Sequence, residues 1–288
     1  MTLQDFLEEA WRDHGDNPQG VADRLRTSTP LIQSAEDFAP YARLVTHVFG
    51  EHLLQFQEGI ALLESLRGLP AFDASSAAAS PLVRSRATLQ YAGGDAQALT
   101  GLSGEDHVCA LAGVSGMHTG RNQFDLAAKT LDLALAAAVR DGPAQSPVNR
   151  ALAVAGNNLA AALEEKTDRT ARQTQAMLAA AHTGLTYWKL AGTWLEDERA
   201  EYRLTRCLLQ AGDPKLALES AQRCLSVCQR NDAPAFELFF AQAMLALASR
   251  AAGDGTGFSE HREAALRSYR QVPADEQAWC SQELGELG

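Results

Sequence analysis

Aromatic residues, lysines and long apolar runs are all scarce in this sequence of 288 residues. Aromatics make up 7% of it, and most of its 25 basic residues are arginines. No apolar run reaches the roughly 18 residues of a membrane-spanning helix. The 36 acidic residues leave a net charge of −11, which repels nucleic-acid phosphates and anionic lipids. We therefore expect neither nucleic-acid nor membrane binding.

Cysteines are few, odd in number and scattered, which does not indicate a disulfide framework in a chain of this length. Cys224 and Cys228 lie one helical turn apart, and we interpret them as small packing residues rather than metal ligands. The first sixteen residues, MTLQDFLEEAWRDHGD, are acidic and amphipathic, and they contain no signal-peptide cleavage pattern. A reducing, cytoplasmic location is the expectation.

What the sequence has in abundance is alanine, which favours closely packed helices. Pairs made of a small residue followed by a polar one recur between amphipathic segments. These pairs predict helical hairpins, because Gly ends one helix and the next helix begins soon after it. Helix starts are predicted at Thr193, Ser34 and Ser103, each with an acidic residue three positions on. The turn pairs begin at Gly15, Gly50, Gly94, Gly120, Thr167, Gly212 and Gly253.

The segment 198–230 shows the hairpin pattern most clearly. Its first half places Leu204 and Leu208 on one helical face, and its second half repeats small residues at helical spacing. This segment resembles the tetratricopeptide repeat (TPR), in the longer form found in kinesin light chains and bacterial peptide-sensing proteins. The residues in the positions of the TPR motif are Leu204, Thr205, Leu208, Gly212, Asp213, Ala217, Cys224 and Leu225.

The resemblance implies an all-α, right-handed superhelical solenoid of antiparallel hairpins. Similar patterns starting at Asp106, Ala153 and Phe239 give an array over 106–271. We expect degenerate hairpins over 1–105 and a C-terminal capping helix over 272–288. The stretch 72–83 is rich in Ser and Ala and is expected to be a loop. The short interval from Gly94 to Gly120 is expected to distort the solenoid.

In TPR arrays the first helix of each repeat lines a concave groove, and the resemblance assigns groove positions here. Asn158, Arg199 and Arg203 match part of the dicarboxylate clamp with which some TPR domains hold acidic chaperone tails. Ala110 and Val114 replace the polar residues of the clamp's first repeat, so the full clamp is absent. The predicted peptide-binding residues are Asn157, Asn158, Arg199, Tyr202, Arg203, Arg206, Phe240 and Met244.

Each of these assignments has a structural alternative. The arginines could pair with acidic residues of their own helix as a solvated charge lattice. Phe236, Phe240 and Met244 follow at helical spacing, which is also typical of core residues. Trp188, Trp194 and Trp279 are expected to serve packing.

Enzyme motifs are absent from the sequence. His47 and His52 stand close together in THVFGEH, but an α-helix would point their rings about 140° apart, and Gly50 is expected to end the helix. We therefore predict no metal site, no cofactor and no catalytic residue. The leading hypothesis is a non-enzymatic scaffold that binds an extended peptide or a partner protein, with an acidic group of that partner as the candidate contact. A ligand-sensing regulator and a self-associating module are the alternatives, and the oligomeric state is left open.

Overall fold

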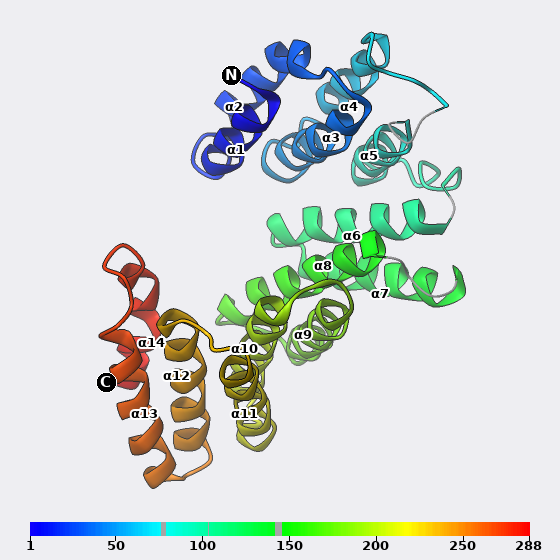
Figure 1. Ribbon diagram of the computed structural model, residues 1–288. Coiled ribbons are helices and arrows are strands. Elements are labelled where there is room, and N and C mark those ends of the chain that lie inside the picture. Colours follow the sequence, from blue (N-terminus) through cyan, green and yellow to red (C-terminus); the bar gives the residue numbers. More distant parts are fainter. Residues whose placement is uncertain (76–78, 103, 142–145) are drawn as a thin grey trace. The chain divides into compact units, whose positions relative to one another are not determined.

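The computed structural model describes residues 1–75, 79–102, 104–141 and 146–288, and these ranges contain fourteen α-helices and no strand. The all-α class is therefore confirmed, and consecutive helices pack against one another (Figure 1). The chain divides into two compact units, unit 1 (1–151) and unit 2 (152–288). No helix of the described ranges combines the length and apolar character needed to cross a membrane.

Unit 1 begins with two short helices that the predicted turn at Gly15 connects. Its core gathers large side chains such as Phe38, Tyr41 and Phe49, and the buried Tyr41 hydroxyl lies 3.1 Å from that of Ser28. The helices assigned to this unit are α1 (Leu3–Asp13), α2 (Pro18–Ser28), α3 (Phe38–His47), α4 (Phe56–Ser65), α5 (Ala79–Ala92), α6 (Gly104–Gly120) and α7 (Phe124–Asp141).

Two expectations for unit 1 are wrong. Gly50 does not end a helix, because a π-helical turn over Val48–His52 continues α3. The stretch 72–83 is not a loop throughout, since α5 begins at Ala79; residues 76–78 lie outside the described ranges. The predicted helix start at Ser34 holds, where the backbone N–H donates to Asp37 at 2.9 Å. Ser103 is not among the described residues.

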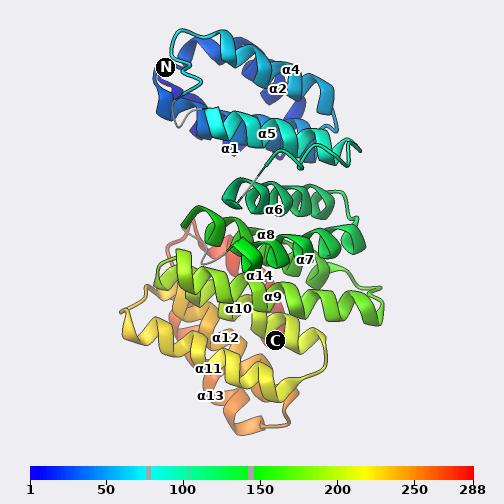
Figure 2. The ribbon, with the colours of Figure 1, turned by 90° about the vertical axis from the view of Figure 1, so that its right-hand side faces the viewer.

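Unit 2 consists of helical hairpins followed by a short terminal helix. Gly212 ends α10 with φ of +77° and Gly253 ends α12 with φ of +79°, as the predicted turns require. Figure 2 shows these helices stacked along the unit. They are α8 (Ser146–Glu165), within which the unit begins, α9 (Ala171–Ala191), α10 (Trp194–Gln210), α11 (Pro214–Arg230), α12 (Ala235–Ala251), α13 (Gly255–Tyr269) and α14 (Ser281–Leu287).

The C-terminal segment forms the helix α14, which packs on α12. Leu287 and Cys280 are buried there, and the Leu287 carbonyl accepts a hydrogen bond of 2.8 Å from Arg262 Nε. Trp279 is 75% exposed, so the expectation that it serves packing is wrong. The division of the sequence into degenerate hairpins, repeat array and cap stays a prediction.

Candidate functional site

The predicted groove residues of α10 are positioned by a strong helix start. Thr193 and Glu196 form a capping box, with the Thr193 backbone N–H donating to Glu196 at 2.8 Å. From this fixed start, Arg199, Arg203 and Arg206 follow at intervals of four and three residues, which places them on one side of the helix. Their exposure decreases along α10, from 57% for the Arg199 side chain to 21% for Arg203 and 6% for Arg206.

Arg206 is the centre of a buried ionic cluster. Its Nε and Nη2 donate to Glu164 Oε1 of α8 at 3.1 and 3.0 Å. The same guanidinium donates to Glu283 at 3.2 Å and to Glu286 at 3.1 Å, both on α14. One side chain thus joins three helices of unit 2. We call Glu164, Arg203, Arg206, Glu283 and Glu286 the acidic-helix cluster.

Tyr202 reinforces the contact between α10 and α14. Its hydroxyl donates a hydrogen bond to Glu283. Burial, together with the charge of Glu283, raises the pKa of this hydroxyl far above its usual range, so it remains a donor at physiological pH. A carboxylate held by both a guanidinium and a hydroxyl makes charge-assisted hydrogen bonds, the stronger class in proteins.

The other two arginines also bond to neighbouring helices. Arg199 donates to Glu237 of α12 at 2.6 Å, and Arg203 donates to Glu164 at 3.0 Å. The bond to Glu237 raises the pKa of Arg199, which keeps it charged. These bonds differ from the own-helix charge lattice considered above, since each runs between helices and its acceptor is buried.

Asn157 and Asn158 lie on α8, where Asn158 is exposed and Asn157 is half-buried. The backbone of Asn157 lies against Gly184 of α9, where an added Cβ would stand 3.1 Å from the Asn157 nitrogen. Asn157 is therefore beside the α8–α9 contact, while Asn158 faces solvent. Glu164, two turns further along α8 than Asn157, carries the contact between α8 and the α10 arginines.

Phe240 stands next to the cluster on α12. Its ring packs edge-on against Tyr202, with the centroids 5.6 Å apart, and against Phe236 at 5.0 Å. Phe240 and Phe236 are half-buried, whereas Met244 is completely buried. The structure thus joins Tyr202 and Phe240 on one surface and places Met244 in the interior.

Sequence reasoning missed Glu283 and Glu286. They occur in the segment QELGEL, which the sequence indicates only as a capping helix. Their three-residue spacing, which puts both carboxylates on one helix face, was the available signal. Which surface that face would meet depends on the turn at residues 270–276 and could not be read from spacing.

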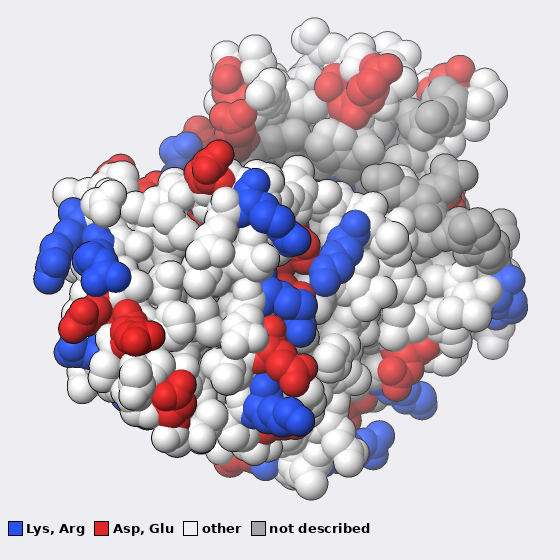
Figure 3. Space-filling view, turned by 60° about the horizontal axis from the view of Figure 1, so that its bottom comes forward, with Lys and Arg blue, Asp and Glu red and all other residues white. Residues whose placement is uncertain are grey.

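Charged side chains of both signs alternate along part of the surface. Figure 3, which brings the lower part of Figure 1 forward, shows a row of alternating basic and acidic residues, separated by an uncharged area from further charged groups at the left of the view. Within the acidic-helix cluster the count is two arginines and three glutamates. The cluster therefore carries a formal charge of −1 with α14 in place and +1 without its two glutamates.

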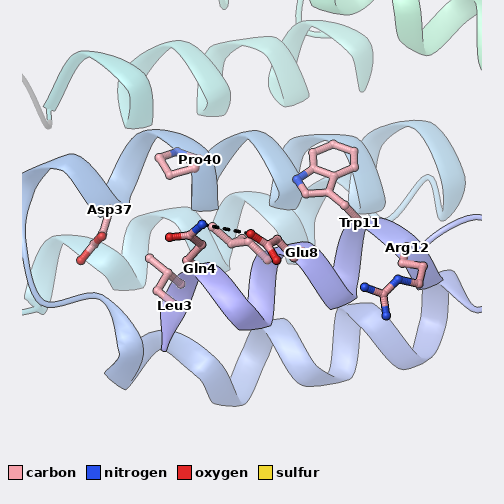
Figure 4. A pocket seen from close by; sticks show the side chains of 8 residues that line it. Leu3, Gln4, Glu8, Trp11, Arg12, Asp37 and Pro40 are labelled. Carbon is pink, nitrogen blue, oxygen red and sulfur yellow. Dashed lines mark hydrogen bonds between the residues drawn. The ribbon is translucent and has the colours of Figure 1, made fainter. Parts of the chain in front are cut away.

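A separate open groove of about 650 Å³ lies in unit 1. It runs along α1, where Gln4 donates to Glu8 at 3.0 Å, with Pro40 of α3 across from them and Trp11 at one end (Figure 4). Its lining contains none of the residues predicted for peptide binding.

The fold and the cluster define an all-α protein of consecutively packed helical hairpins. The sequence matches no protein-family model and no curated protein. Among solved structures, the crystal structure of BtubC (BKLC) from P. vanneervenii aligns with 93% of this chain and 91% of its own, at 16% identity and a TM-score of 0.47.

Proposed function

We propose that this chain is a non-enzymatic, TPR-like scaffold that binds an acidic peptide segment of a partner protein on the α10 face of unit 2. The supporting observation is that an acidic helix already occupies this face, with Glu283 and Glu286 on Arg206 and Tyr202. The chain's own C-terminus therefore serves as an example of the ligand. The proposal keeps the predicted cytoplasmic location and needs no cofactor.

The chemistry of the face suits such a ligand. Arg203 and Arg206 offer two guanidinium groups, Tyr202 offers a hydroxyl, and Arg199 is the most exposed cation of the row. Glu164 neutralises one of the arginines, and a partner that supplies two carboxylates would replace those of α14. Phe240 and Phe236 add apolar surface beside these groups, against which an apolar side chain of the peptide would pack.

The first prediction concerns competition between α14 and a free peptide. A labelled peptide with the sequence of residues 276–288 is titrated into the full chain and into its Glu283→Gln/Glu286→Gln variant, with binding followed by fluorescence polarisation. The variant should bind the peptide at least about tenfold more tightly than the wild type, because its own helix has lost the charge-assisted bonds that compete. The same peptide with Gln at positions 283 and 286 should bind at least about tenfold more weakly.

Two control variants make this test specific. Glu263→Gln/Glu276→Gln removes two exposed carboxylates outside the cluster and should leave peptide affinity at the wild-type level. Arg199→Ala/Arg203→Ala, introduced into the Glu283→Gln/Glu286→Gln variant, should weaken binding of the acidic peptide about tenfold or more. Circular dichroism confirms that the helices persist. Equal affinity for the acidic and the Gln peptide would remove the α10 face from the binding site.

A further inference from the structure

Three histidines of unit 1 converge on one point of the surface. His14 ends α1, His47 ends α3, and His52 ends the π-helical turn. One ring nitrogen from each lies within 4.8 Å of the other two. The three ring centroids are 4.8 to 5.1 Å apart. The sequence separates His14 from His47 by two helices, so only the fold brings them together.

The π-helical turn is what places His52 beside His47. The backbone N–H of Leu53 donates to the carbonyl of Val48 at 3.0 Å, a bond from i to i+5. In this wider turn, residues five apart lie near the same side of the helix, whereas an α-helix would separate them by about 140°. The Nε2 atoms of His47 and His52 consequently lie 3.2 Å apart.

Close packing and a hydrogen bond hold this turn in place. A Cβ at Gly50 would stand 2.6 Å from Met117 Cε and 2.9 Å from Leu89 Cδ2, so the turn lies directly against these side chains of α6 and α5, which would have to shift for a larger residue. Arg121 Nη2 donates to the Gly50 carbonyl at 3.0 Å. Turns of this type are frequently found at functional sites.

Neighbouring acceptors fix the orientation of two of the rings. His14 Nδ1 lies 2.6 Å from the carbonyl oxygen of Trp11, and His47 Nδ1 lies 3.0 Å from Glu51 Oε1. Both oxygens are acceptors, so each Nδ1 atom carries a proton, and Nε2 is the ligand atom of each ring in its neutral form. His47 Nε2 faces His52 Nε2, a contact that a metal ion would replace. Histidines that bind metals have this arrangement, in which the second ring nitrogen donates to a carbonyl or carboxylate.

We propose that His14, His47 and His52 form a binding site for a divalent transition-metal ion, with Zn²⁺ as the preferred ion. Neutral imidazole nitrogens suit zinc, copper and nickel, whereas calcium and magnesium require oxygen ligands. With Zn–N bonds of about 2.0–2.1 Å, ligand atoms of a tetrahedral site lie about 3.3 Å apart. The pair His47–His52 already has this spacing, and side-chain shifts of about 1.5 Å close the rest.

The site has three protein ligands and an open side. His52 is exposed while His14 and His47 are half-buried, so the fourth tetrahedral position faces solvent and accepts water or an external ligand. Bound metal also ties α1 to the end of α3. The ring of Trp11, 5.0 Å from that of His47, connects this site with the end of the open groove in Figure 4.

The second prediction tests this site with Zn²⁺ alone and the full chain. After treatment with a chelator, the protein competes with a chromophoric zinc indicator, and the wild type should bind one equivalent. His47→Gln and His52→Gln should each weaken that binding at least about 100-fold, since even partners of a ligand contribute about 10–100-fold. Glu51→Gln should weaken it by about tenfold or more. His52 is exposed, so its variant tests the site without disturbing the core.

Controls distinguish zinc binding at this site from zinc binding by cysteines or by other exposed histidines. His182→Gln, an exposed histidine of unit 2, should bind zinc as the wild type does. The Co²⁺-loaded protein should show the visible bands of a nitrogen site without a thiolate charge-transfer band. Failure of the wild type to bind Zn²⁺, equal binding by the wild type and His52→Gln, or a thiolate band from the bound equivalent would each overturn the proposal.

Discussion

Glu198 is a carboxyl group held almost entirely out of solvent. The residue is 1% exposed, and its Oε1 accepts a hydrogen bond of 3.2 Å from the Cys224 thiol. Burial, followed by the nearby Cys228 and Glu237, raises its pKa from 4.5 to about 9. Glu198 is consequently protonated at neutral pH in the folded chain, while its unfolded counterpart is charged.

This difference gives the third prediction, a pH dependence of stability. Between pH 4.5 and about 9 the folded chain holds a proton on Glu198 that the unfolded chain lacks. Its contribution to the free energy of unfolding is therefore complete below pH 4.5 and declines as pH rises through that window, by up to about 1.4 kcal/mol per pH unit. Glu198→Gln is neutral at every pH and should lose this decline.

Urea unfolding of wild type and variant from pH 5 to 9 measures the effect. The variant should gain stability relative to the wild type as pH increases. The exposed Glu263→Gln serves as the matched control and should follow the wild-type profile. Parallel profiles for Glu198→Gln and the wild type would show that Glu198 ionises normally when folded.

At the same scale, the sequence predicted some side-chain neighbours and not others. Helical periodicity puts Arg199, Arg203 and Arg206 on one face, and the structure agrees because that relation is local to α10. Their acceptors Glu164 and Glu283 lie 42 and 77 residues from Arg206. The packing of whole helices sets such distant pairs, and spacing along one helix carries no information about them.

Among the elements, α8 and α9 approach each other closely at a pair of glycines, Gly156 and Gly184. A Cβ on Gly156 of α8 would stand 2.7 Å from the Gly184 nitrogen and 2.8 Å from the Ala180 oxygen of α9. Both are backbone atoms, so no side-chain rotation can relieve the overlap. Glycine at position 156 is thus what permits the two backbones to approach.

The fourth prediction follows from this contact. Gly156→Ala should lower the free energy of unfolding by about 1–3 kcal/mol, the usual cost of inserting atoms into a well-packed interior. Gly255→Ala is the control in the same unit, because a Cβ there meets nothing within 4 Å. Chemical denaturation compares the two variants. Equal stabilities would mean that α8 and α9 can separate without cost.

The elements also show where sequence rules fail. Turns at Gly212 and Gly253 were predictable because positive φ and the following Asp cap leave a signature in the sequence. The π-helical turn at Val48–His52 was not, since its extra residue is accommodated by Gly50 packing against Met117 and Leu89. The assumption of 100° per residue therefore misplaced His52 and concealed the histidine cluster.

At the scale of the whole molecule, each compact unit contains a core of its own. Buried residues from Leu3 to Met117 form a continuous cluster in unit 1, and a second cluster in unit 2 includes Cys224 and Ala241. The hairpin pattern of the sequence predicted the succession of helices but did not indicate a boundary near residue 151. Periodicity describes a helix and its immediate neighbours, whereas a unit boundary depends on contacts summed over many helices.

The fifth prediction is that the two proposed ligands act on different units. A ligand that binds only the folded state adds about 2.7 kcal/mol of stability at 100 times its dissociation constant, which corresponds to about 100-fold slower exchange for amides that exchange through unfolding of the site. In hydrogen-exchange mass spectrometry, Zn²⁺ should slow amides of α1, α3 and the turn over Val48–His52, all within unit 1. Exchange in α10–α14 should stay at its metal-free rate.

The acidic peptide should give the reverse pattern in the Glu283→Gln/Glu286→Gln variant, with slower exchange in α10 and α12 and no change in α1–α3. His52→Gln abolishes the first pattern and leaves the second intact, so either proposal can fail without the other. If zinc instead slows exchange evenly from α1 to α14, the chain unfolds as one cooperative body. The two compact units would then share a single unfolding equilibrium, and a ligand on either unit would stabilise both.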